Sequence, residues 1–161
     1  RRKHPILRRR RWFEGTSIRG TDLTDIGWFQ PNGEQMTEHD WRVSFARTLC
    51  VFLNGMGIRS PNQRGGQVVD DSFLVLFNAH HDALDFTIPK AVDIAPWTTI
   101  LDTTEWTTPP GQLYQPGEVT SVTGRSIRVL RHEHPGVARA NTNTENYRRR
   151  PVSRTAIRRQ G

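Results

Sequence analysis

Cysteine is almost absent from this sequence of 161 residues, because Cys50 is the only one. A lone cysteine excludes an intrachain disulfide, and the apolar neighbours of Cys50 indicate a buried thiol in a reducing cytoplasm. Long apolar runs are also absent, since none approaches the roughly 20 residues that a membrane-spanning helix needs. The charged N-terminus is not followed by the apolar segment of a signal peptide. We therefore expect a cytoplasmic protein with no membrane partner.

Acidic residues are scarce at both ends of the chain. Residues 1–11 and 139–161 each contain seven basic residues, and of the 16 acidic residues only Glu145 lies in either end. The two ends together carry a formal charge of +13, whereas residues 12–138, with nine basic and 15 acidic residues, carry −6. Basic ends can bind phosphate polymers, but no helix-turn-helix, zinc-finger or RNP-like pattern accompanies them. Solvated tails are therefore favoured, and nucleic acid is not the expected partner.

The most apolar part of the chain is a run of strand length at residues 73–77. It is followed by residues 84–88, in which Leu84, Phe86 and Ile88 alternate with polar residues. An apolar run followed by alternation indicates a central strand and a half-exposed neighbour, and the polar turn between them predicts a hairpin. Further strands are predicted at residues 42–53, 97–102, 119–122 and 126–131.

Helical signals are short. Thr37 with Asp40 three residues later forms a weak capping box for a single helical turn, and residues 16–35 read as an irregular connection. About six strands separated by turn signals, with no long helix, predict an all-β fold. We expect an antiparallel β-sandwich at residues 42–131 and a disordered basic tail at residues 132–161.

A series of short motifs then carries a resemblance to a known family. Their order and spacing resemble the C-terminal end of bacterial glycogen debranching enzymes, which are isoamylase-type members of the α-amylase superfamily. The resemblance covers about residues 1–131, and no single motif would suffice for it. The motifs are the residues 1–13, Asp25-Ile-Gly-Trp-Phe29, Gly33-Glu-Gln-Met-Thr37 with Asp40-Trp41, Leu53-Asn-Gly55, Asp70-Asp-Ser-Phe73 through Asn78-Ala-His-His81, Trp97 with Leu101-Asp-Thr103, and Gly124-Arg-Ser126 with Val129-Leu130.

The resemblance implies a glycoside hydrolase made of an N-terminal β-sandwich, a catalytic (β/α)₈ barrel and a C-terminal β-sandwich. Such enzymes hydrolyse α-1,6 branch linkages in glycogen or limit dextrins. This chain would supply a remnant of the last barrel helix and a connection (residues 1–41) and the C-terminal sandwich. A barrel needs about 250 residues, and retaining hydrolysis needs two carboxyls roughly 5–5.5 Å apart in a preorganised cleft. We therefore expect no catalytic residue, no cofactor and no activity from this chain alone. The barrel of the parent enzyme is its expected partner, and glycogen or maltodextrin is the expected ligand of the full-length enzyme.

Asp25 and Trp28 are the candidate glycan-binding residues. Ligand sites often combine an apolar or aromatic surface with a few polar groups, although anchoring of this loop on the barrel is favoured over glycan binding. We expect no metal site. Adjacent strand residues point to opposite faces, so Asp70 and Asp71 are expected in a turn-and-cap role. Residues 80–82 are expected in a hairpin turn, because consecutive histidines cannot easily chelate one ion.

Two functional hypotheses follow. The first is an accessory C-terminal domain or fragment of a glycogen debranching enzyme, which begins inside a helix and self-associates through the face that it normally buries. The second is an independent β-sandwich module that binds a glycan or polyanion through its basic ends. The aliphatic and aromatic residues of the first thirteen positions favour the first, since a free-standing module would have nothing to cover them.

Overall fold

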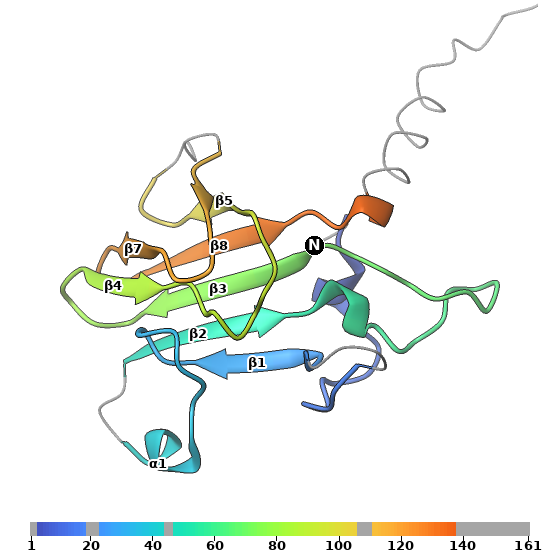
Figure 1. Ribbon diagram of the computed structural model, residues 1–161, viewed down its shortest axis with the longest axis horizontal. Coiled ribbons are helices and arrows are strands. Elements are labelled where there is room, and N and C mark those ends of the chain that lie inside the picture. Colours follow the sequence, from blue (N-terminus) through green and yellow to red (C-terminus); the bar gives the residue numbers. More distant parts are fainter. Residues whose placement is uncertain (1–2, 19–22, 44–46, 106–110, 138–161) are drawn as a thin grey trace, which may run out of the picture.

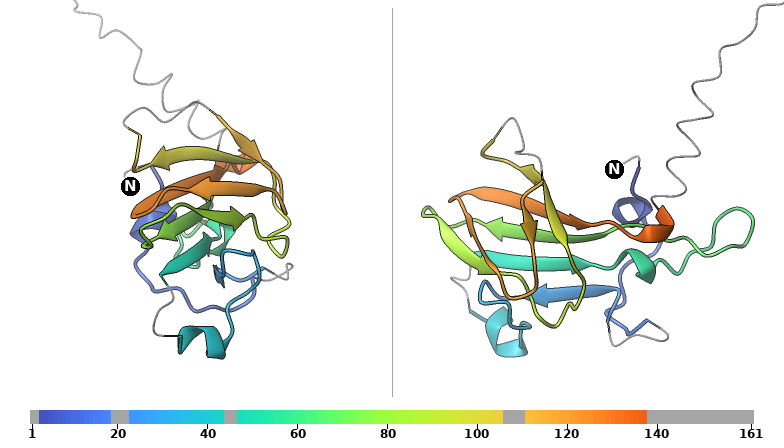
Figure 2. Two further views of the ribbon diagram at one scale, coloured as in Figure 1. Left: turned by 90° about the vertical axis from the view of Figure 1, so that its left-hand side faces the viewer. Right: turned by 45° about the horizontal axis from the view of Figure 1, so that its top comes forward.

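The computed structural model describes residues 3–18, 23–43, 47–105 and 111–137, and they form an antiparallel, all-β fold of two sheets (Figures 1 and 2). The larger sheet has six strands in the order β1-β2-β3-β8-β5-β6, and the smaller sheet pairs β4 with β7. The predicted all-β class is thus confirmed. The strands are β1 (Ile26–Phe29), β2 (Thr48–Leu53), β3 (Ser72–Asn78), β4 (Leu84–Thr87), β5 (Trp97–Asp102), β6 (Leu113–Tyr114), β7 (Val119–Val122) and β8 (Ser126–His132). The short helices are η1 (Pro5–Arg8), α1 (Glu38–Trp41) and η2 (Gly55–Gly57).

Strand β3 is central, as the apolar run predicted, and it pairs with β2 on one side and β8 on the other. Leu74 and Leu76 are fully buried against the small sheet, in a core that also contains Phe86 of β4 and Val122 of β7. Phe73, Val75 and Phe77 alternate with them and point to the opposite side. We call this side, which faces away from β4 and β7, the outer face of the large sheet.

Cys50 lies in the same core and has no exposed surface. Burial in apolar surroundings raises the pKa of its thiol to about 12. The predicted buried thiol is confirmed. Within the described residues no helix is long and apolar enough to cross a membrane.

The predicted hairpin between residues 73–77 and 84–88 is wrong, because β4 pairs with β7 and not with β3. The physical reason lies at Asn78, whose side-chain amide donates to the carbonyl oxygens of Asp82, Val122 and Thr123. These bonds turn the chain away from β3 and into the second layer. Gly124 allows the close approach, since a Cβ there would lie 2.1 Å from the carbonyl oxygen of His81.

The irregular connection predicted for residues 16–35 is also wrong in part, because β1 lies within it and pairs with β2 from Ile26↔Leu53 to Phe29↔Cys50. A four-residue strand is too short to show a period, and Gly27 weakens the signal further. A Cβ on Gly27 would lie 2.8 Å from the Phe29 ring, so this glycine leaves room for the core aromatic. The large sheet therefore includes residues upstream of position 42, where the sequence placed the start of the sandwich.

The remaining strand predictions match β5, β7 and β8, and β2 occupies the second half of the strand predicted at residues 42–53. The capping box is confirmed, since the Thr37 hydroxyl accepts from the Asp40 backbone N–H and the Asp40 carboxylate accepts from the Thr37 N–H. Most of the predicted basic tail, from residue 138 onward, lies outside the described residues.

Candidate functional site: an apolar groove on the outer face

The outer face carries an apolar groove of about 650 Å³. Strands β1, β2 and β3 form its floor, and the segment at residues 12–15 forms one wall. Apolar side chains on three neighbouring strands can line one surface because residues two apart on a strand share a face. The floor residues are Ile26, Trp28, Leu49, Val51, Leu53, Val75 and Phe77.

The N-terminal segment covers one end of the outer face. Ile6 is only 2% exposed and packs with Ile58 and Phe73 in a second apolar cluster. The backbone N–H of Ile6 donates to Asp70 Oδ2 at 2.9 Å, and His4 Nδ1 lies 2.9 Å from Asp70 Oδ1. These contacts join η1, which belongs to the chain segment before the sheet, to the start of β3. The groove is the part of the outer face that this segment leaves uncovered.

Asp25 holds the later residues of the same N-terminal segment. Its carboxylate has no exposed surface and accepts hydrogen bonds from Arg9 Nη2 at 3.2 Å, Glu14 N at 3.1 Å and Gly15 N at 2.9 Å. The Arg9 side chain is only 7% exposed, and its guanidinium carbon Cζ lies 4.0 Å from the centre of the Phe13 ring. Asp25 therefore anchors residues 9–15 of its own chain beside the groove. Anchoring of this loop on a barrel stays a prediction.

Trp12 is the most exposed large apolar residue among the described ones, at 90%. It lines the groove and also a second hollow of about 460 Å³ under residues 6–13. Leu7, in the same segment, is 40% exposed. Exposed aromatics beside an apolar groove are typical of a surface that meets another protein.

Trp28 meets Trp41 of α1 at the edge of the groove. The ring centroids are 5.5 Å apart and the ring planes differ by 78°. Trp28 is 37% exposed and Trp41 is 54% exposed. The structure therefore brings Trp28 together with Trp41 and not with Asp25, its partner in the sequence-based hypothesis. The capping box of Thr37 and Asp40 predicted the helical turn that carries Trp41. The sequence did not indicate that this turn would lie beside β1, which carries Trp28.

The other candidate clusters have structural partners. Asp70 accepts from the N–H groups of Ile6 and Asp71, and Asp71 accepts from the His134 N–H at 3.0 Å. Both carboxylates are buried, so they serve as caps that join three segments, in line with the predicted role. His4, Asp70 and Asp71 have ligand atoms within 4.8 Å of one another, but those bonds already engage both carboxylates.

The histidine pair at residues 80 and 81 lies in the turn between β3 and β4. With Asp82 it forms a second group whose ligand atoms lie within 4.8 Å of one another. His80 Nδ1 accepts from the Asp82 N–H at 3.1 Å, so one ring nitrogen is used in closing the turn. The turn is where the sequence predicted it, although it links two layers and not a hairpin.

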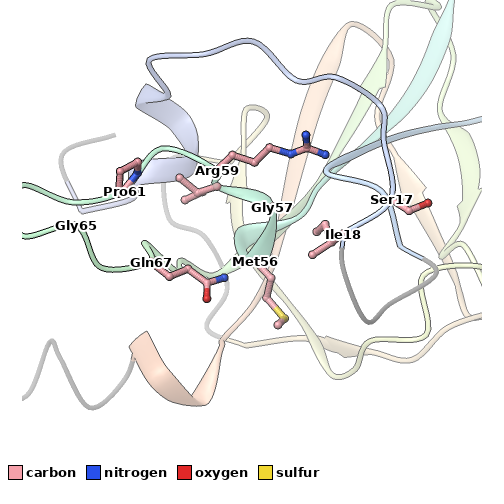
Figure 3. Close-up of a pocket in the computed structure, with 9 residues that line it drawn as sticks. Ser17, Ile18, Met56, Gly57, Arg59, Pro61, Gly65 and Gln67 are labelled. Carbon is pink, nitrogen blue, oxygen red and sulfur yellow. The ribbon is translucent and has the colours of Figure 1, made fainter.

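A further hollow of about 640 Å³ lies beside η2 (Figure 3). Among the described residues that line it, Arg59 is the charged one, and its side chain extends toward the segment that contains Ser17 in the figure. The Arg59 guanidinium is bound to the Glu14 carboxylate at 2.7 Å and also to the Thr16 hydroxyl. Because these partners already engage the guanidinium, the hollow offers weaker ligand chemistry than the groove.

Sequence reasoning missed most of the groove. The signal that was available is the apolar run at residues 73–77, which is apolar on both faces and therefore needs a cover on each side. Unlike Trp12 and Trp28, Trp97 does not line the groove, because it is fully buried in the core. Trp106 lies outside the described residues.

Comparison with known families identifies the fold. A family model described as "Isoamylase, C-terminal" matches residues 25–132, which contain every strand of both sheets. The chain belongs to the isoamylase C-terminal family. The resemblance seen in the sequence motifs is thereby confirmed.

Relatives of this isoamylase C-terminal chain are much longer than the chain itself. Proteins named "Glycogen operon protein GlgX homolog" from Mycobacterium tuberculosis (strain ATCC 25618 / H37Rv) and Mycobacterium bovis are 44% identical to it over 135 residues, which is 81% of this chain. An "Isoamylase" from Flavobacterium sp. is 23% identical over 126 residues, or 78% of this chain. The chain spans 18% of the length of the mycobacterial relatives and 15% of the Flavobacterium protein. The chain thus matches only a small part of each of these relatives.

Proposed function

We propose that this chain is the accessory C-terminal domain of a glycogen debranching enzyme and that its groove packs against the catalytic (β/α)₈ barrel. The full enzyme would hydrolyse α-1,6 branch linkages in glycogen or limit dextrins, and this domain would contribute no catalytic group. The relatives support this proposal through their names and their greater length. Residues 1–41 would then connect the last barrel helix to the sheet. The cytoplasmic location remains a prediction.

The groove is the single observation that carries the proposal. A mostly apolar surface spans three strands, and a 90% exposed tryptophan stands at its rim. Soluble monomers rarely expose contiguous apolar patches larger than a few hundred square ångströms unless they serve binding. The segment that borders the groove is also the one through which the chain would continue to a preceding domain. A preceding domain is therefore well placed to cover the surface.

The proposal is tested by adding the chain to the separately produced catalytic segment of the Mycobacterium tuberculosis relative. We expect the chain alone to release no linear maltooligosaccharides from glycogen β-limit dextrin, and to bind the catalytic segment and raise its activity. Trp12→Ala should weaken binding at least about tenfold, because an exposed tryptophan that a partner covers commonly contributes strongly to an interface. Val119→Ala, which changes an exposed residue of β7 in the small sheet, away from the groove, is the control and should bind normally. Release of maltooligosaccharides by the chain alone would contradict the absence of a catalytic group.

A further inference from the structure

We propose that Trp28 and Trp41 form a binding corner for a curved α-1,4-linked glucan chain. The choice of an α-glucan as the ligand rests on the proposed function, whereas the corner itself rests on the geometry of the two indoles. Both rings are large and partly exposed, and they meet edge to face at 5.5 Å with planes 78° apart. The corner lies at β1, the edge strand of the large sheet, with α1 beyond it (Figure 1).

The corner is held in place by the chain around it. A four-residue helix has no stability of its own, yet α1 is fixed by its capping box and by a hydrogen bond from Gln30 Nε2 to Asp40 Oδ2 at 2.9 Å. The backbone N–H of Met36 also donates to the carbonyl oxygen of Trp28 at 2.9 Å, which ties the connection before α1 to β1. A surface that is rigid before binding loses less conformational entropy when a ligand arrives. The Trp41 ring is therefore presented in a defined position.

The chemistry of the corner fits a neutral sugar. A pyranose presents apolar C–H groups on its faces and hydroxyls at its rim, so it packs against an aromatic face while its rim meets polar groups. The polar groups next to Trp41 include the Asp40 carboxylate, whose Oδ2 accepts from Gln30 and Thr37. The same hydrogen bonds from Thr37, backbone first, hold the pKa of Asp40 below its ordinary value. The exposed side chains of Glu38 and Arg42 form an ion pair at this helix, with 3.7 Å between Arg42 Nη2 and Glu38 Oε2.

The angle between the rings favours a curved chain. Successive residues of an α-1,4-linked glucan turn relative to one another, so one sugar can stack on the first indole while its neighbour packs against the second. A flat β-1,4-linked chain would need two coplanar rings. The 78° angle between Trp28 and Trp41 matches the first geometry and not the second.

The test measures binding of maltoheptaose to the 161-residue chain by calorimetry and tryptophan fluorescence, with cellohexaose as the β-linked comparison. We expect maltoheptaose to bind with a Kd on the order of 1 mM or tighter, and cellohexaose to bind at least about tenfold more weakly. Trp41→Ala should abolish measurable binding, and Trp41→Tyr should retain part of it, since the aromatic face is kept. Trp12→Ala is the matched control, because it removes an exposed tryptophan outside the corner, and it should bind like the wild type.

The outcomes separate this proposal from the docking proposal. Loss of maltoheptaose binding in Trp41→Ala but not in Trp12→Ala supports the corner, whatever happens with the catalytic segment. Absence of binding by the wild type, equal loss in both alanine variants, or equal binding of cellohexaose would overturn it. Trp12→Ala and Val119→Ala test docking to the catalytic segment, whereas Trp41→Ala tests glucan binding by the isolated chain, so failure of either proposal leaves the other measurable.

Discussion

Asp25 shows how one buried carboxylate holds the N-terminal segment beside the sheet. It receives a guanidinium and two backbone N–H groups, and it has no exposed surface. A buried ion pair adds little relative to an apolar replacement of the same shape, but removing one partner leaves an uncompensated charge. Gly57 packs directly against it, since a Cβ there would lie 2.7 Å from the Asp25 Cβ. The residue is therefore structural.

Asp25→Asn keeps the size of this side chain and removes its charge. We expect the free energy of unfolding to fall by about 3–5 kcal/mol, because the Arg9 guanidinium would stay buried without a counter-charge. Urea denaturation followed by circular dichroism measures this loss. Glu38→Gln is the control, because Glu38 pairs with Arg42 at the surface, where both side chains are at least 80% exposed and the pair contributes little. A similar loss in both variants would contradict the role of burial.

Asp102 is a residue whose protonation should lower the stability of the fold at low pH. Burial raises the pKa of its carboxyl, but the hydrogen bonds from Thr104 and Arg128 outweigh burial and lower that pKa below 3.8. The Arg128 guanidinium also donates to the Thr120 hydroxyl, which in turn donates to Tyr114, so the network joins the two sheets. A carboxyl whose pKa is lower in the folded state stabilises the fold above its unfolded pKa, and this stability is lost as the pH falls through the folded pKa.

Asp102→Asn should therefore lower the free energy of unfolding at neutral pH by about 1–3 kcal/mol, the usual effect of losing hydrogen bonds to a charged group. The variant should also lose less stability than the wild type when the pH falls from neutrality to below about 4. Urea unfolding at a series of pH values measures both effects. Asp85→Asn, at an exposed position on β4, should leave the pH profile unchanged. An unchanged profile in Asp102→Asn would show that other carboxylates dominate acid unfolding.

At the scale of elements, the corner after β3 decides how the two sheets are connected. Asn78 is 1% exposed, and its side-chain amide binds three carbonyl oxygens from the turn and from the end of β7. Its own carbonyl-type oxygen Oδ1 accepts from the His80 N–H at 3.0 Å. The Asn78 side chain thus donates to backbone carbonyl groups at the point where the chain leaves the large sheet for the small one.

Asn78→Ala should lower the free energy of unfolding by about 2–4 kcal/mol, because it leaves buried carbonyl groups without a donor. Hydrogen exchange followed by mass spectrometry should show faster exchange in β4 and β7 than in β3. Asn62→Ala is the control, since the Asn62 side chain accepts from Arg64 and Gly66 in an exposed loop only. Uniform loss of protection across both sheets would mean that Asn78 does not act at the corner specifically.

The sequence predicted the elements that carry a strong local pattern. The apolar run of β3, the alternation of β4, the strands β5, β7 and β8 and the capping box of α1 were all predicted, because each depends on residues close in the chain. The hairpin failed because the choice between pairing with β3 and crossing to the second sheet depends on Asn78 contacting Val122, 44 residues away. Strand β1 was missed because four residues with a central glycine show no period. The groove could not be predicted from the sequence, because its floor forms only when β1, β2 and β3 pair side by side.

For the whole molecule, the two faces of the large sheet differ in what covers them. The small sheet covers the inner face with Phe86 and Val122, both fully buried. On the outer face, the described residues leave Val75 and Phe77 half-buried in an open groove. The formal charge of −6 on residues 12–138 opposes association of identical copies, whereas apolar contact between two grooves favours it.

The isolated chain should therefore associate with itself in a concentration-dependent way through the groove. Val75→Asp places a charge on the groove floor and should shift sedimentation toward the monomer. Val119→Asp is the matched control, because it changes an exposed valine of β7 in the small sheet and should leave association unchanged. Circular dichroism checks that both variants fold.

Adding salt or the catalytic segment distinguishes association through apolar contact at the groove from association through the charged ends. If apolar contact drives it, added salt should not weaken it, since screening acts on charges, and the catalytic segment should compete with it for the same surface. Association that is equal in both variants, or that disappears in about 0.5 M salt, would place the contact elsewhere and point to the basic ends. Competition by the catalytic segment, lost in Val75→Asp and kept in Val119→Asp, would identify the groove as the surface that serves both contacts.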